Sequence, residues 1–456
     1  MLVPAPSVGH IPSMDENLLN DVVAAALKAG ADAAEAVGAE RRSLSISVRM
    51  GDLEEVEREE SRDLGLRVFV GQRQATVSGS DISPEARAKL VERAVAMARL
   101  APEDPYAGLA DPDRLARGPL PDLDLYDPSE PSAEALEDRA RAAEAAARAV
   151  PKVTNSDGGS GSWSSAHWTI VTSGGFKGVH RASGFSIGAS AIAGDGETME
   201  TGYDGRSVRW QADLPTPESL GAEAGRRAAQ RLGARKIAST TAPVIFENRL
   251  AGSLMSPLIG AISGPSIARG TSFLKDKLGE QIFAKGVYLV DDPHRVRGLG
   301  SSPFDDEGVA NERRNLIDDG VLTTWLLNSS SARQLGLSTT GHASRGLAGP
   351  PGVSTSNLTL QPGDKDQAGL MKDAGSGLLV TSMFGPSLNG NTGDWSVGCS
   401  GIWFENGEST GPVTEITVAG NLIDIYARLV PGSDLEFRGA SNSPSILVDA
   451  LAIAGK

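Results

Sequence analysis

The sequence has few of the residues on which metal and thiol chemistry depend. It contains one cysteine, Cys399, in 456 residues, which excludes an intramolecular disulfide and a thiolate metal cluster within one chain. No two of its five histidines lie within ten residues of each other, and none is followed by glutamate. A zinc-binding helix of the H-E-x-x-H type is therefore absent. A zinc site built from distant histidines and carboxylates remains open but is not favoured by any spacing.

Long apolar runs and basic stripes are also missing. No run approaches the roughly 20 apolar residues that span a bilayer, and residues 1–14 have neither the basic region nor the apolar core of a signal peptide. The net charge is −15, and the arginines alternate with acids, as in "EVEREESRD". Nucleic-acid binding needs clustered basic charge. We therefore expect a cytoplasmic protein that contacts neither membrane nor nucleic acid.

The first half of the chain repeats one pattern. Each repeat is a helix, a set of alternating strands and a second helix, and a connector rich in proline, aspartate and glycine (101–131) separates the repeats. Ser83-Pro84 has the residue types of a helix N-cap and first turn. The expected helices are 14–30, 83–100, 132–149 and 217–232, and the expected strands lie within 44–79 and 153–212.

The second half has a different character. From residue 241, short apolar segments alternate with turns of glycine, asparagine, serine and aspartate, and many of the 54 glycines lie here. This pattern predicts a mostly antiparallel β domain. The predicted fold class is α+β, with an N-terminal region at 1–235 (two similar parts, 14–101 and 131–233) and a C-terminal β-rich domain at 236–456.

Several residues have features of a site but also fit plainer structural roles. Ser186 lies in a G-x-S-x-G match, "GFSIG", but its flanks alternate like a continuous strand, so a nucleophile elbow is not favoured. Two acidic clusters near His294, at 291–292 and 305–307, offer oxygen ligands for a cation, although their composition is typical of turns. Among the histidines, His342 in the polar segment "TTGHASRG" is the best candidate for contacting a ligand.

The most unusual stretch is 391–408, "NTGDWSVGCSGIWFENGE", where Trp395 stands among glycines. Glycine allows close approach of another backbone, and exposed strand backbone can pair with an extended peptide. A tightly curved sheet core explains the stretch equally well.

Over nearly its whole length the chain resembles the TldD/PmbA family, and within it the PmbA (TldE) branch. The segments that carry the resemblance are "GTSFLKDKLGEQIF" and four others, at 47–81, 270–283, 316–345, 354–363 and 391–422. The resemblance implies a pair of homologous subunits that together form a zinc metalloprotease. In the TldD-type subunit an H-E-x-x-x-H motif binds the zinc with a cysteine further along the chain.

In this sequence the motif positions hold no metal ligand. By the resemblance, the histidines and glutamate would align with Ser256, Pro257 and Ala261 in "SPLIGA", and the cysteine would fall near 437–439, in "EFRGAS". Serine, proline and alanine cannot supply the imidazole donors or the carboxylate that zinc hydrolysis needs. We expect this segment to keep a helix, with Leu254 and Leu258 on its apolar face, but to have lost the chemistry.

The resemblance thus predicts a non-catalytic subunit with no catalytic or metal-binding residues and no cofactor of its own. Zinc is expected in a TldD-type partner, and the substrates are expected to be peptides or unfolded protein segments. Asn391, Gly393, Trp395 and His342 are candidates for the wall of a substrate cavity. The alternatives are a homodimeric peptide-binding or scaffold protein and, in third place, a serine hydrolase using Ser186.

Overall fold

The computed structural model describes residues 14–456. The N-terminal stretch on which the expectation of no signal peptide rests lies almost entirely outside these residues. Within residues 14–456, none of the helices combines the length and the apolar character needed to cross a membrane.

The N-terminal region is one six-stranded antiparallel sheet. Its two halves join because the first strand of each half pairs with the other, from Glu35 opposite Thr172 to Val48 opposite Gly159. The strand order is β3-β2-β1-β4-β5-β6. The strands are β1 (Ala33–Arg49), β2 (Asp52–Val70), β3 (Arg73–Gly79), β4 (Val153–Thr172), β5 (Lys177–Ala193) and β6 (Glu200–Val208).

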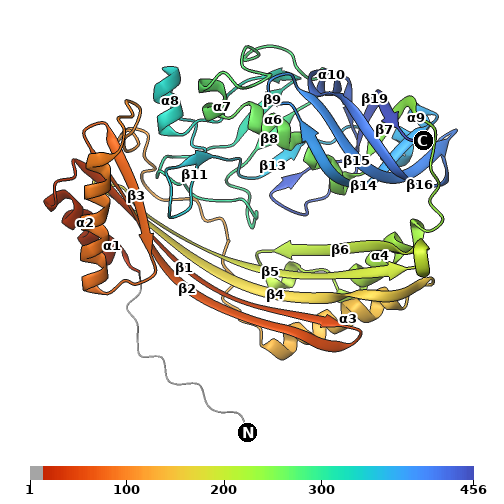
Figure 1. Cartoon of the computed structure of the whole chain (residues 1–456), viewed down its shortest axis with the longest axis horizontal. Helices are drawn as coiled ribbons and strands as arrows, with labels where there is room; N and C mark the ends of the chain where they lie inside the picture. Colours follow the sequence, from red (N-terminus) through yellow and green to blue (C-terminus); the bar gives the residue numbers. More distant parts are fainter. Residues whose placement is uncertain (1–13) are drawn as a thin grey trace, which may run out of the picture.

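Four helices accompany this sheet, two from each half. Each begins after a side chain that accepts a backbone N–H of the first turn, which satisfies a donor that the helix itself leaves free. In Figure 1, α1 and α2 lie at one end of the sheet and α3 lies beneath its outer face. The helices are α1 (Glu16–Lys28), α2 (Pro84–Leu100), α3 (Ala133–Arg148) and α4 (Pro217–Gln230).

The C-terminal region contains a closed five-stranded barrel. Strand β16 pairs with β15 on one side and with β19 on the other, which closes the ring β16-β15-β14-β7-β19. Short strand β17 extends the sheet beside β19. The bounds are β7 (Thr240–Phe246), β14 (Gly377–Leu388), β15 (Asp394–Glu405), β16 (Glu408–Asn421), β17 (Leu429–Pro431) and β19 (Ile446–Ala454).

A second, smaller sheet and several short helices complete this region. The sheet has the order β10-β9-β8-β13-β18, and β11 (Ala343–Ser344) pairs with β12 (Gly352–Val353). The predicted α+β class, with a mostly β C-terminal region, is confirmed. The remaining bounds are β8 (Leu289–Asp291), β9 (Arg314–Asp318), β10 (Val321–Leu322), β13 (Leu358–Leu360), β18 (Ser441–Asn442), α5 (Asn248–Ala251), α6 (Met255–Ala261), α7 (Gly264–Ala268), α8 (Ser329–Leu335), α9 (Gln367–Ala374), α10 (Leu422–Arg428) and the 3₁₀ turns η1 (Gly196–Thr198), η2 (Gln211–Asp213) and η3 (Gly252–Leu254).

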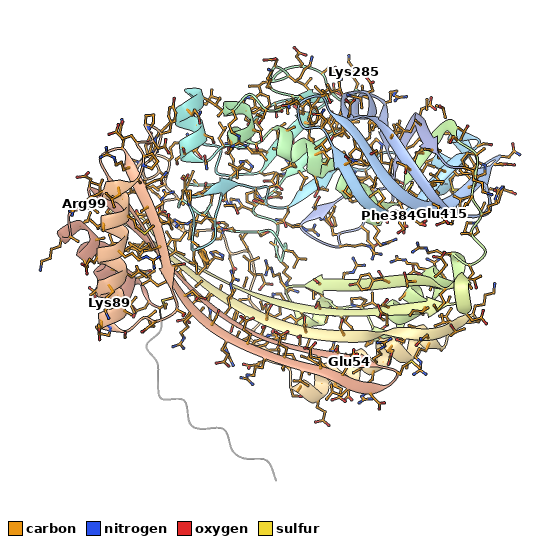
Figure 2. The ribbon with its side chains drawn as sticks, in the orientation of Figure 1. Glu54, Lys89, Arg99, Lys285, Phe384 and Glu415 are labelled. Carbon is orange, nitrogen blue, oxygen red and sulfur yellow. The ribbon has the colours of Figure 1, made fainter. Side chains whose placement is uncertain are left out.

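The two regions stack as layers, with the C-terminal region over the concave face of the long sheet (Figure 1). Buried charges join them: Glu35 of β1 pairs with Arg67 of β2 at 2.9 Å and with Arg345 from the C-terminal region. Lys89 and Lys285, labelled in Figure 2, lie at the rim of the molecule. Buried ion pairs thus help to hold the two layers together, and removal of one partner from such a pair lowers the stability strongly.

Candidate functional site

The segment at the zinc-motif positions is helical but broken. Instead of one helix there are three short pieces, α5, η3 and α6. Pro257 lies in the first turn of α6, where its missing N–H removes no helical hydrogen bond. Leu254 and Leu258 of the predicted apolar face are fully buried, as is Met255.

Neighbouring elements hold this segment in place. Tyr426 of α10 is fully buried and donates its hydroxyl to the carbonyl oxygen of Leu254 at 2.9 Å. Its ring stacks on Phe283 with 4.8 Å between centroids. At the other end, the Ser272 hydroxyl donates to the carbonyl oxygen of Ala261 at 2.7 Å. The helix pieces are therefore fixed at both ends, which keeps their outer face in a defined position.

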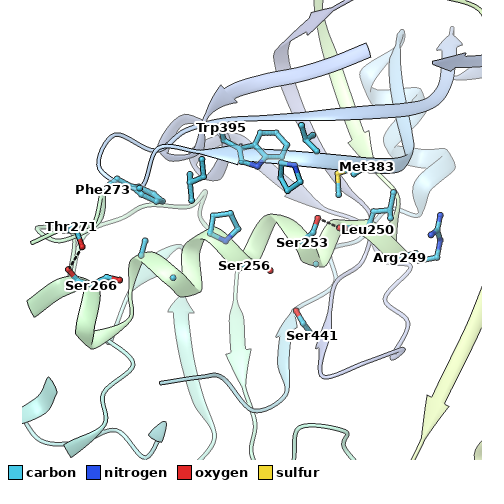
Figure 3. Close-up of a pocket in the computed structure, with 18 residues that line it drawn as sticks. Arg249, Leu250, Ser253, Ser256, Ser266, Thr271, Phe273, Met383, Trp395 and Ser441 are labelled. Carbon is cyan, nitrogen blue, oxygen red and sulfur yellow. Dashed lines mark hydrogen bonds between the residues drawn. The ribbon is translucent and has the colours of Figure 1, made fainter. Parts of the chain in front are cut away.

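That outer face lines a cavity of about 830 Å³. Ser256, Pro257 and Ala261 all contribute to it, together with Gly260. Figure 3 shows the helix pieces forming one long wall, with Arg249 at one end and Thr271 at the other. The three motif positions thus lie side by side on one surface of a hollow.

The opposite wall comes from the barrel. Met383, Pro386 and Leu388 of β14 and Trp395 of β15 line it, and Phe273 closes one end (Figure 3). Trp395 is 7% exposed and packs edge-to-face on Phe246 at 6.2 Å. This wall is apolar because its residues, such as Trp395 and Met383, belong to the edge of the hydrophobic core of the C-terminal region.

Beyond Val380, β14 has a free edge beside the cavity. Strand β7 pairs with it only from Leu378 to Val380, whereas β15 pairs with it as far as Leu388. Within residues 14–456, no strand pairs with the other side of residues 382–388. Pro386 lies in this stretch, as proline does on edge strands. The free backbone groups can accept an extended chain as an added strand.

The cavity lining does not fit a zinc ion. Among the described residues that line it there is no histidine, cysteine, aspartate or glutamate, and its one charged side chain is Arg249. That guanidinium donates to the carbonyl oxygen of Thr381 at 2.9 Å and to the Glu247 carboxylate at 3.3 Å. The arrangement can hold an apolar or extended ligand but offers no group that would activate water.

Of the predicted wall residues, only Trp395 is part of this lining. Asn391 and Gly393 form the turn next to it: Gly393 has φ +82°, and its N–H donates to the carbonyl oxygen of Asn389 at 2.8 Å. The turn meets the cavity through Gly390, which is part of the lining and accepts the N–H of Phe273 at 3.0 Å.

His342 lies elsewhere, buried within the C-terminal region. Its Nδ1 is 2.8 Å from the Thr340 hydroxyl and its Nε2 is 3.2 Å from a carboxylate oxygen of Asp291. Only 3% of its side chain is exposed. Because both ring nitrogens have partners and the side chain is buried, His342 stabilises the conformation of its own loop.

The acidic cluster at 305–307 is buried and bonds to backbone. Asp305 accepts the N–H groups of Glu307, Val309 and Ala343 at 2.8 to 3.1 Å. Burial raises the pKa of Asp305 and Glu307, and raises that of Asp306 to about 6. In the described part of the chain, no group of three or more His, Cys, Asp or Glu is placed to hold a metal ion.

Ser186 and Cys399 both lie inside strands. Ser186 is in the middle of β5, without the sharp turn of a nucleophile elbow, and its hydroxyl is 2.6 Å from that of Ser162 on β4. Cys399 is fully buried in the barrel, and burial raises the pKa of its thiol to about 12. Neither side chain has the surroundings of a nucleophile.

Three family models match the chain in succession: PmbA/TldA metallopeptidase domain 1 at 34–98, the central domain at 126–232 and the C-terminal domain at 239–455. The chain belongs to the TldD/PmbA metallopeptidase family. It is a PmbA/TldE-type member, 40% identical to the metalloprotease PmbA of Escherichia coli O157:H7 over 447 residues, with 96% of each chain covered. A PmbA homologue of Haemophilus influenzae is 36% identical, with 94% of each chain covered.

Solved structures share the fold of this family member. A candidate modulator of DNA gyrase from Bacteroides thetaiotaomicron superposes with a TM-score of 0.90 at 29% identity, covering 98% of this chain and 100% of that one. TldE from Thermococcus kodakarensis superposes with a TM-score of 0.84 at 21% identity, covering 96% and 100%. The match to TldE concerns the fold alone.

Sequence reasoning missed most of the cavity. Met383 and Pro386 reach it from a strand far from the motif positions in sequence, and no local pattern marks Met383 or Phe273 as part of a cavity. The one available signal was Pro386 within an apolar run, which is typical of an edge strand.

Proposed function

We propose that this chain is the non-catalytic PmbA/TldE-type subunit of a heterodimeric zinc metalloprotease, in which a TldD-type subunit carries the zinc. The complex degrades or processes peptides and unfolded protein segments in the cytoplasm. The observation that carries the proposal is the cavity at the motif positions, whose lining has room for a ligand but no donor for zinc.

Two features of the cavity support a role in holding peptide. Its walls are mainly apolar, with Trp395 and Phe273 available to pack against an apolar side chain. The free edge of β14 at residues 382–388 runs along it. Backbone pairing at such an edge depends little on side chains, so it suits substrates of varied sequence.

The test measures zinc content and peptide cleavage for this chain alone, for a TldD-type relative alone and for the mixture. We expect cleavage of an unstructured peptide to require the TldD-type chain, and zinc to be absent from this chain on its own. Stoichiometric zinc in the isolated chain, lost in His342→Gln or His294→Gln, would instead reveal a site assembled from distant residues.

The same samples separate the alternative of a homodimeric peptide-binding protein. Size-exclusion chromatography with light scattering reports whether mixing produces a new species with one copy of each chain. If this chain remains a homodimer in the mixture and adds nothing to cleavage, the scaffold alternative replaces the proposal.

A further inference from the structure

A second cavity, of about 620 Å³, lies between the two regions of the chain. We name it the arginine cleft. Its lining carries five arginines and only two acids, Asp213 and Glu436, an excess of three positive charges in a chain whose net charge is −15. The arginines are Arg206, Arg209, Arg295, Arg297 and Arg438.

Three of these arginines already have carboxylate partners. Each bond is 3.0 Å or shorter, so these guanidinium groups are largely neutralised where they stand. The pairs are Arg206 with Glu436, Arg297 with Asp124 and Asp213, and Arg438 with Glu436 and Asp204.

The other two have no carboxylate partner among the described residues. All three guanidinium nitrogens of Arg209 donate to backbone carbonyl oxygens, those of Ser183, Gly298 and Leu299, so its charge has no carboxylate partner but its donors are in use. Arg295 lies over the Phe437 ring, 3.3 Å from its centroid. Stacking engages the flat face of a guanidinium and leaves its N–H groups free in the plane. Burial lowers the pKa of both groups, and for Arg295 the charge of the Asp292 carboxylate opposes that shift without forming an ion pair.

A neighbouring cavity provides the contrast. It has a volume of about 360 Å³ and is also rich in arginine, but each of its arginines has a carboxylate within 3.3 Å. Unpaired positive charge is therefore a property of the arginine cleft rather than of every gap between the two regions. The paired arginines are Arg226, Arg227, Arg231 and Arg249.

The arginine cleft adjoins the apolar cavity through one segment. Residues 436–439 line the cleft, and Ser441 lines the cavity. The side-chain oxygen of Asn442, the residue after Ser441, accepts the N–H groups of Arg438 and Gly439 at 2.7 and 3.0 Å. The segment is thus held in one shape, and a chain lying along it meets apolar walls at one end and guanidinium groups at the other.

We propose that the arginine cleft binds carboxylate groups of peptide substrates, so that this chain selects acidic segments. The planar fork of arginine matches a carboxylate through two parallel hydrogen bonds. The inference rests on the proposed role in peptide handling. Its test measures binding by the isolated chain, so a failure to cleave peptide in the mixture would not decide it.

The probe is a short, unstructured, dye-labelled peptide rich in glycine, serine and glutamate, compared with its glutamine counterpart by fluorescence anisotropy. A C-terminal amide version shows whether side chains or the terminal carboxylate are bound. We expect the glutamate peptide to bind at least about tenfold more tightly, since a hydrogen bond to a charged group is worth about 1.5–3 kcal/mol. Added salt should weaken that binding.

Two variants should act in opposite directions. Arg295→Gln removes an unpaired charge and should weaken binding of the glutamate peptide about tenfold. Glu436→Gln removes the carboxylate partner of Arg206 and one of the two partners of Arg438, which keeps Asp204, and should strengthen binding of the glutamate peptide. Arg93→Gln is the matched control, because Arg93 is exposed on α2 and makes the same change of charge outside the cleft. A folding defect would weaken peptide binding in either variant, so it cannot account for weaker binding in one and stronger binding in the other.

Three results would overturn the proposal. Equal binding of the glutamate and glutamine peptides would mean that carboxylates are not recognised. An unchanged affinity in Arg295→Gln would place recognition elsewhere. Inorganic phosphate that binds more tightly than the glutamate peptide, with the same dependence on Arg295, would make the cleft a phosphate site.

Discussion

Substitution of Gly260 places a side chain directly in the cavity, because this residue of α6 faces the open space. A Cβ atom added there would meet no heavy atom within 4 Å. Glycine inside a helix costs about 0.5–1 kcal/mol relative to alanine, so Gly260→Ala should stabilise the chain by up to about 1 kcal/mol. That corresponds to about 2–4 °C in the melting temperature of a domain of this size.

Gly264, four residues on, is the matched comparison. A Cβ there would lie 2.4 Å from the Ser331 hydroxyl and 2.7 Å from a methyl group of Leu327. Overpacking of this kind costs about 1–3 kcal/mol, so Gly264→Ala should lower the melting temperature. If Gly260→Ala and Gly264→Ala change the melting temperature in the same direction, the open space at Gly260 is not what distinguishes the two positions.

Gly260→Trp then tests the cavity itself. The indole should occupy the hollow without disturbing the fold, and affinity for an apolar unstructured peptide should fall at least about tenfold, since a fully buried apolar side chain is worth about 1.5–3 kcal/mol. Gly346→Trp is the control, because Gly346 is exposed and a Cβ there also meets open space. Unchanged binding by Gly260→Trp, measured by fluorescence anisotropy, would refute the assignment of the cavity to peptide.

Three further predictions concern stability. Burial raises the pKa of Asp306 to about 6, so the folded chain holds this proton more tightly than the unfolded chain, and the resulting stability is lost as pH rises from about 4 through about 6. In Asp306→Asn, the free energy of unfolding measured with urea should therefore vary less over this pH range, by up to about 3 kcal/mol. Tyr426→Phe removes the bond to the Leu254 carbonyl and should cost about 1–3 kcal/mol in the same assay. Arg345→Ala leaves Glu35 with one partner fewer and should cost about 3–5 kcal/mol, with a calorimetric transition that broadens or splits as the two layers uncouple.

The local elements of the fold were predictable because their signals are local. Ser83-Pro84 begins a helix at the expected place, and each half of the N-terminal region has its strands between two helices. The way these pieces join was not predictable. Pairing of β1 with β4 and closure of the barrel by β16 and β19 link residues far apart in sequence, and alternation within a strand does not specify its partner.

The candidate site shows the same division. The positions of Ser256 and Trp395 followed from a resemblance and from an unusual local composition, and both lie in the cavity lining. The polar loop around His342 suggests contact with a ligand, but a polar loop can be buried when side chains such as Asp291 and Thr340 bind the imidazole. The arginine cleft gave no sequence signal, because its arginines come from separate segments in which acids are also frequent.

The two sides of the α5–α6 segment explain how this wall can stay folded without a metal ligand in the cavity lining. Leu254, at the end of η3, and Leu258 of α6 pack in the core of the C-terminal region, and this burial stabilises the helical segment independently of the side chains on its other face. The outer face holds Ser256 and Gly260, which add no charge to the cavity. Without a charge on this face, the desolvation cost when an apolar side chain enters is smaller than it would be with a carboxylate or an imidazolium there. Charge is concentrated instead in the adjoining arginine cleft, so the two cavities together offer apolar walls and guanidinium groups to the two ends of an amphipathic segment.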